Sequence, residues 1–264
     1  MHVVRVTLGI ALAASPIAAQ SIADRVAAAP DGQVQLTYPV RPGVCGDGAG
    51  AIGVGPHTFF GEVRVMRGSW QVRCVPGPAR VLISVQSHTV AGVRVYVGSG
   101  DESANKAPAV DLGVVTPQAA ADYLLDLAPR LDRHSSEQAL LGAMIGDGTV
   151  VTPRLFTLAR DSSATRNTRH QALFWLGQLA RAKVNGRADW TGDDDANDPG
   201  DQGDERRSAI FALSQLPHRD GVPALIEVIR TNKNPGLRGS AIFWLADSGD
   251  PRAVELFETL LRGR

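Results

Sequence analysis

Cysteine, aromatic residues and net charge are all scarce in this 264-residue sequence. It has two cysteines, aromatic residues make up 5%, and 27 basic residues balance 27 acidic ones. No cluster of lysine and arginine alternates with aromatic residues, which disfavours nucleic-acid binding. Beyond residue 20 no stretch approaches about 18 uninterrupted apolar residues, so we expect no membrane span in the mature chain.

The short motifs of common catalytic sites are also missing. The sequence has no G-x-S-x-G, no H-E-x-x-H and no glycine-rich phosphate loop. Its histidines are widely separated, and no pair has the spacing of metal ligands. A catalytic site assembled from distant residues would leave no such motif, so an enzyme is kept as an alternative to a binding protein.

Residues 1–19 have the pattern of a secretory signal peptide. Arg5 precedes an apolar run that ends at Ala14, and the small residues Ala18 and Ala19 stand where cleavage would occur. We therefore expect an exported protein, either periplasmic or extracellular. A retained membrane anchor is the alternative.

The two cysteines are predicted to pair. In an oxidising compartment, a small even number of cysteines favours a disulfide over a metal or redox site, so we predict a bond between Cys45 and Cys74. By restricting the unfolded chain, it would stabilise a small domain by roughly 3 to 4 kcal/mol. Free buried thiols are the alternative.

Residues 33–98 have the alternation typical of β-strands. Apolar side chains alternate with polar ones at Val34, Leu36 and Tyr38, and again at Val93, Val95 and Val97. Turns rich in glycine and proline separate such runs. We predict a small antiparallel β domain, followed by a linker at residues 99–115.

The second half of the chain repeats itself. One apolar motif recurs at steps of 33, 37 and 32 residues, starting at Ala139, Ala172, Ala209 and Ala241. Large apolar residues that share one helical face stand 16 and 19 residues after three of these alanines: Leu155 and Leu158, Leu225 and Val228, Phe257 and Leu260. This period predicts stacked helical hairpins over residues 116–264, starting with a cap at Thr116 and Pro117.

These units resemble the HEAT family of helical repeats. Residues 169–179, 207–230 and 238–262 carry the resemblance, with a weaker unit at 137–160. It implies an α-solenoid whose second helices line a concave face that binds another protein. Polar residues of those helices are the candidate partner-binding residues: Arg154, Glu227, Arg230 and Glu255.

The second unit departs from the repeat. No apolar helical face can be drawn between Asn185 and Asp204, so we predict that an irregular acidic insert, residues 185–205, replaces its second helix. Alternating oxygen-bearing side chains there suit Ca²⁺, although the glycine and glutamate of an EF-hand loop are missing. The candidate ligands are Asp193, Asp195, Asn197, Asp201 and Asp204. A solvated acidic loop is the alternative.

Taken together, the patterns predict an α+β fold of two domains: a small antiparallel β domain with one disulfide, then a short HEAT-like α-α solenoid. We predict an exported interaction module or scaffold that binds another protein and has no intrinsic catalysis. Ca²⁺ in the acidic insert is the one cofactor considered. The alternatives are a lyase-type enzyme or enzyme accessory, which the HEAT-like resemblance allows, and a calcium-responsive adaptor that uses the insert.

Overall fold

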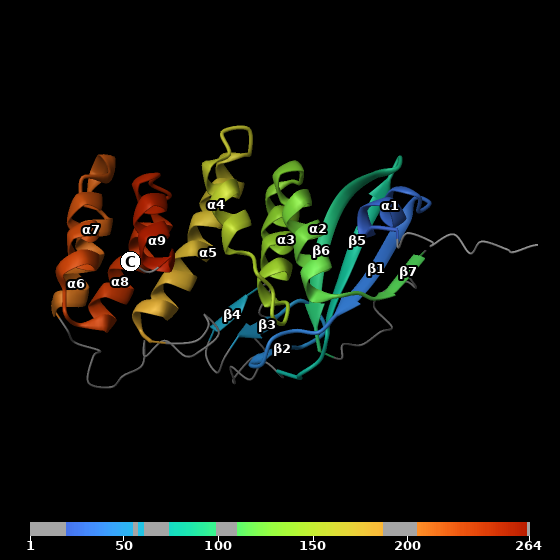
Figure 1. Ribbon diagram of the computed structural model, residues 1–264, viewed down its shortest axis with the longest axis horizontal. Coiled ribbons are helices and arrows are strands. Elements are labelled where there is room, and N and C mark those ends of the chain that lie inside the picture. Colours follow the sequence, from blue (N-terminus) through green and yellow to red (C-terminus); the bar gives the residue numbers. More distant parts are fainter. Residues whose placement is uncertain (1–19, 55–57, 61–73, 99–109, 187–204, 263–264) are drawn as a thin grey trace, which may run out of the picture.

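The computed structural model describes residues 20–54, 58–60, 74–98, 110–186 and 205–262. A β region lies at one end of the molecule, and helical hairpins form a row beside it (Figure 1). The described chain therefore has the α+β architecture that the sequence predicts. The predicted signal peptide, residues 1–19, and the five candidate Ca²⁺ ligands lie outside the described residues.

Two sheets make up the β region. The strands are β1 (Gly32–Tyr38), β2 (Val44–Gly46), β3 (Ile52–Val54), β4 (Thr58–Phe60), β5 (Ala79–Gln86), β6 (Thr89–Val97) and β7 (Val110–Val114). The larger sheet has the order β6-β5-β1-β7 and the smaller one β2-β3-β4. Val34, Leu36 and Tyr38 of β1 are fully buried, as their alternation predicts.

Strand β7 makes the larger sheet mixed rather than purely antiparallel. β5 pairs with β1 and with β6 in antiparallel fashion, whereas β7 pairs with β1 in parallel. Residues 110–114 fall within the predicted linker, yet they form this edge strand. Their side chains bury little besides Leu112, and Asp111 and Gly113 disfavour strands, so the sequence pattern gives no sign of it.

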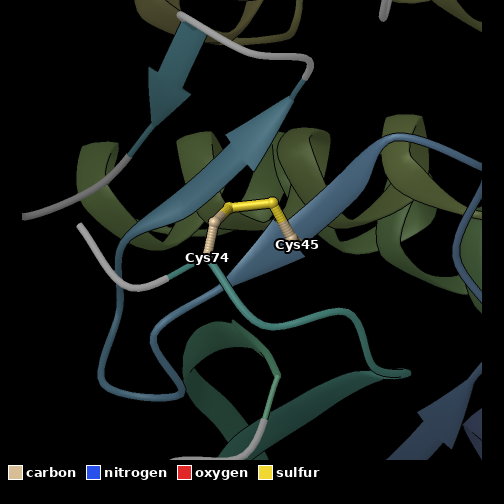
Figure 2. Close-up of a disulfide and its surroundings, with 2 residues drawn as sticks. All are labelled: Cys45 and Cys74. Carbon is tan, nitrogen blue, oxygen red and sulfur yellow. A yellow bond between two sulfur atoms is a disulfide. The ribbon is translucent and has the colours of Figure 1, made fainter. Parts of the chain in front are cut away.

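Cys45 of β2 and Cys74 form the predicted disulfide (Figure 2). Beside it, Gly46 and Val75 exchange backbone hydrogen bonds of 3.0 and 2.8 Å. The disulfide and this short bridge together hold the smaller sheet against the segment that leads into β5.

The helices begin with a short one before the sheet and continue after it. They are α1 (Ile22–Ala27), α2 (Pro117–Leu127), α3 (Arg133–Ile145), α4 (Thr152–Arg160), α5 (Arg166–Val184), α6 (Glu205–Ser214), α7 (Val222–Thr231), α8 (Pro235–Asp247) and α9 (Arg252–Arg262). The predicted cap is present: Thr116 Oγ1 accepts a hydrogen bond of 3.3 Å from the backbone N–H of Ala119. Three of the repeated alanines, Ala139, Ala172 and Ala241, are fully buried.

Helix α3 packs directly on the larger sheet. The Tyr38 hydroxyl donates a hydrogen bond of 2.7 Å to the Gly142 carbonyl, and burial raises the pKa of Tyr38 well above its ordinary value. A Cβ at Gly142 would lie 2.9 and 3.0 Å from methyl groups of Leu124 and Val95, which would have to shift to make room for it. The buried apolar residues of sheet and helices accordingly form one continuous core.

The hairpins do not stack in chain order. Helix α5 packs against α8 and α9, while α6 and α7 pack on the other side of α8 (Figure 1). Gly177 of α5 lies so close to α8 that an added Cβ would be 2.4 Å from the Ala246 Cβ. Lys183 Nζ donates a hydrogen bond of 2.7 Å to the Leu261 carbonyl of α9. The last hairpin in the chain is therefore an inner member of the stack.

Helices α5 and α8 are antiparallel. Gly239, early in α8, faces Arg181 near the end of α5, and His170, early in α5, makes a hydrogen bond of 2.8 Å with the carbonyl of Asp247 at the end of α8. Helices α5 and α8 both carry the repeated motif, at Ala172 and Ala241. In a regular two-helix repeat, successive helices with the motif run parallel, because one helix lies between them. Here two helices, α6 and α7, separate them, so the direction is reversed.

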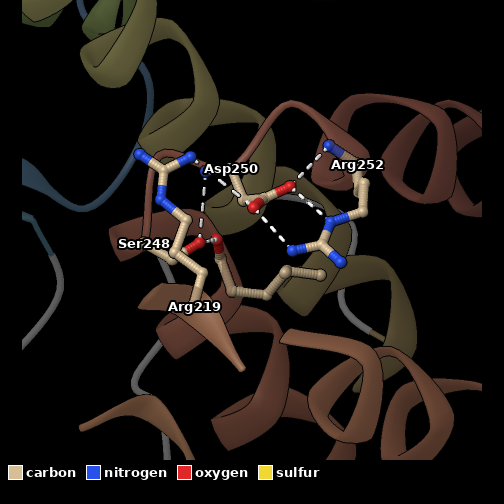
Figure 3. Close-up of polar contacts among 5 residues, drawn as sticks. Arg219, Ser248, Asp250 and Arg252 are labelled. Carbon is tan, nitrogen blue, oxygen red and sulfur yellow. Dashed lines mark hydrogen bonds and ion pairs between the residues drawn. The ribbon is translucent and has the colours of Figure 1, made fainter. Parts of the chain in front are cut away.

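Asp250, in the loop between α8 and α9, joins this loop to the one between α6 and α7 (Figure 3). It is 3% exposed, and its carboxylate accepts three hydrogen bonds of 2.9 Å from Arg252, at the backbone N–H, Nε and Nη2. Arg219, in the loop between α6 and α7, reaches it at 3.5 Å. The bonds from Arg252 hold the Asp250 pKa below its usual 3.8.

We predict that Asp250→Asn lowers the free energy of unfolding by about 2 kcal/mol at neutral pH, because the charge-assisted bonds are lost. Since the folded-state pKa is depressed, this contribution is present above pH 3.8 and disappears as the pH falls further. Urea unfolding at several pH values measures both effects. The exposed Asp220, changed to Asn, is the control and should alter stability by less than about 0.5 kcal/mol. If Asp250→Asn were as stable as the wild type, the stabilising role assigned to the bonds between Asp250 and Arg252 would be contradicted.

A second prediction concerns the contact between α5 and α8. Alanine normally stabilises a helix relative to glycine by about 0.5–1 kcal/mol, but Gly177→Ala would drive two methyl groups together and cost about 1–3 kcal/mol. We therefore expect net destabilisation. Adding Ala246→Gly should relieve it, which gives a coupling energy above about 1 kcal/mol in a double-mutant cycle. Additive effects of the two changes would mean that these helices do not pack there.

Candidate functional site

The predicted partner-binding residues lie on three separate helices. Glu227 and Arg230 of α7 and Glu255 of α9 are exposed. Arg154 of α4 is half-buried and forms an ion pair with Asp126 of α2. Glu255 also borders a cavity of about 460 Å³. Their role as binding residues stays a prediction.

A metal site is not evident in the described part of the chain. There, no group of three or more histidine, cysteine, aspartate or glutamate side chains is placed to hold an ion. The same residues include no helix that is both long and apolar enough to cross a membrane.

A cavity of about 550 Å³ lies where the helices meet the sheet, and we call it the junction groove. Strand β6, the loop between β2 and β3, and helices α3 and α5 form its walls, and the end of α8 closes it. Its apolar wall includes Val95, Leu141, Phe174 and Trp175. Polar groups, among them Arg94, His134, Glu137 and Gln171, surround this surface.

Local contacts hold the walls of the junction groove in place. β6 is an edge strand, and the Gln138 side chain of α3 accepts a hydrogen bond of 3.0 Å from the Val95 backbone N–H. This contact covers part of an edge that would otherwise be open to pairing. On α5, the rings of Phe174 and Trp175 meet edge to face, with centroids 5.2 Å apart.

The chemistry of the junction groove suits a peptide side chain. Protein-binding sites typically combine a buried apolar and aromatic centre with a polar rim that excludes water and forms hydrogen bonds. Trp175 is 3% exposed and supports the wall, whereas Phe174 is half-buried and contributes surface to the cavity. An apolar side chain of a partner would fit this arrangement.

Sequence reasoning does not find the junction groove, because its walls come from distant segments. Phe174 and Trp175 are noticeable in the sequence, but their recurrence in each unit favours a packing role. That interpretation holds for buried Trp175. Phe211 of α6, the equivalent of Phe174, is 47% exposed, and the centroids of its ring and the Trp244 ring are 5.0 Å apart.

Comparison with known proteins supports the resemblance for the C-terminal part. Residues 198–263 match the family of HEAT repeats. No curated protein and no solved structure shows significant similarity to the chain.

Proposed function

We propose that this protein, with HEAT repeats in its C-terminal part, is an interaction module or scaffold that binds another protein through the junction groove. HEAT repeats indicate a protein-interaction role. The observation that carries the proposal is the half-buried, aromatic wall of a cavity of about 550 Å³ with polar groups around it. The protein acts by binding and performs no catalytic step of its own.

Export is a second part of the proposal. The pattern of residues 1–19 supports it, and so does the disulfide between Cys45 and Cys74, because such bonds persist in oxidising compartments. A partner should therefore be sought in the periplasm or outside the cell.

Photo-crosslinking tests which surface meets the partner. A photoreactive residue replaces Gln171 in the junction groove, or Glu227 on α7, in the full chain within its native cells. We expect a specific adduct from position 171, which mass spectrometry then identifies. A specific adduct from position 227 alone would instead support the face predicted from the second helices and overturn the groove assignment.

We predict that Phe174→Ala weakens binding of that purified partner at least tenfold. Burying one large apolar side chain contributes about 1.5–3 kcal/mol, and this variant removes much of the wall that would bury it. Isothermal titration calorimetry measures the affinity, and circular dichroism checks that the variant is folded. Phe211→Ala on α6 is the matched control and should bind within twofold of the wild type. Equal affinities for both variants would contradict the proposal.

A further inference from the structure

A second cavity, of about 740 Å³, opens where α3 and α5 begin. Four arginines border it: Arg133 of α3, Arg166 and Arg169 of α5, and Arg219 from the loop between α6 and α7. Among the described lining residues, Asp247 is the one carboxylate. We call this the basic cavity. It adjoins the junction groove, because His170 and Asp247 border both.

One of these arginines, Arg166, stands at an unfavourable place for the protein alone. Arg133 and Arg166 are the first residues of their helices, and neither helix has an acidic residue in its first turn. The N-terminus of a helix carries a partial positive charge, so a basic side chain there is repelled and an anion is attracted. At α3 the carboxylate of the N-cap residue Asp132 already takes this place, because it accepts a hydrogen bond of 3.1 Å from the Ser135 backbone N–H. The N-cap of α5 is the neutral Thr165, so the start of α5 favours an anion in this cavity.

The arginines have few carboxylate partners. Arg133 pairs with Glu137 at 3.0 Å, but its side chain remains 78% exposed. Arg169 donates to the Ala164 carbonyl, which carries no net charge, and it also lies close enough to the Asp161 carboxylate to interact with its charge. Within the described part of the chain, the Arg166 side chain has neither a hydrogen-bond nor an ion-pair partner.

The other polar groups reinforce this excess of donors. Arg219 reaches Asp250 at 3.5 Å, yet that carboxylate already accepts the bonds of Arg252. The backbone of Arg219 is also held in the left-handed region, with φ of 63°, which is costly for a non-glycine residue. Asn167, which borders the cavity, has a buried side-chain N–H₂ group with no acceptor among the described residues. The cavity is thus rich in donors and poor in acceptors.

We propose that the basic cavity binds the carboxylates of an acidic segment of the partner, next to the side chain held in the junction groove. This inference rests on the proposed function and adds a charge requirement to it. A partner segment would carry an apolar residue and a short run of aspartate or glutamate close to one another.

The arrangement of charge favours several carboxylates over one phosphate. The arginines come from three separate segments and border a cavity of about 740 Å³, so their charge is distributed. A phosphate group is held best by donors that converge on one point. Asp247 would also repel a doubly charged group more strongly than a singly charged one.

The test uses hexaglutamate with capped ends as the probe and the full chain as the receptor. We expect calorimetry at low salt to show binding that weakens as salt is added. Arg166→Gln should raise the dissociation constant at least fivefold. Lys233→Gln is the control, because it removes an exposed charge in the loop before α8, whereas the basic cavity lies at the other end of α8. Its dissociation constant should stay within twofold of the wild-type value. An unchanged affinity in Arg166→Gln would overturn the proposal, as would displacement of the probe by an equal concentration of inorganic phosphate.

A stability measurement separates this role from misfolding. Arg166→Glu replaces the positive charge at the start of α5 with a negative one, so its melting temperature should be higher than that of the wild type while hexaglutamate binding is lost. A lower melting temperature together with weaker binding would mean that Arg166 supports the fold instead.

The two proposals can fail separately. If the partner cross-links at position 171 and Arg166→Gln binds both it and hexaglutamate normally, the charge requirement is wrong and the function stands. If hexaglutamate binds as expected but no protein cross-links at position 171, the proposed function fails, and with it the assignment of the acidic segment to a partner.

Discussion

The close packing of α5 is the constraint on which the rest of the structure depends. It contacts α3 and α4 on one side and α8 and α9 on the other. Gly177 permits the approach to α8, and α3 in turn covers the larger sheet at Gly142. One helix thus connects the core beneath the sheet to the core of the C-terminal hairpins, which explains why the buried residues form a single cluster.

Both candidate binding surfaces follow from how α5 meets its neighbours. Because α8 runs antiparallel to α5, the end of α8 arrives at the start of α5, where His170 bonds to the Asp247 carbonyl. The positive end of one helix dipole lies beside the negative end of the other, which is favourable. The same reversal brings the loop that holds Arg219 to this end, so the junction groove and the basic cavity become neighbours.

The parts of the fold that local patterns determine could be predicted from the sequence. The alternation at Val34, Leu36 and Tyr38 gives a strand, the buried alanines mark the hairpins, and the sole pair of cysteines forms the disulfide. Strand β7 was not predicted, because its place in the sheet depends on backbone hydrogen bonds to β1 rather than on its own side chains. The order of the hairpins and the two cavities depend on contacts such as that of His170 with Asp247, 77 residues apart. The sequence feature that could have indicated the basic cavity is the arginine at the start of α3 and of α5, Arg133 and Arg166.

The position of α8 affects how the chain can fold as it is synthesised. Repeat arrays usually gain from short-range contacts, because each unit docks on the one made just before it. Here α6 and α7 join the stack mainly through α8, which follows them in the chain. Until α8 emerges from the ribosome, the apolar faces around Ile210, Leu225 and Ile229 lack their cover. An α6–α7 hairpin formed before α8 is available would expose this apolar surface, the kind of surface that chaperones bind during synthesis.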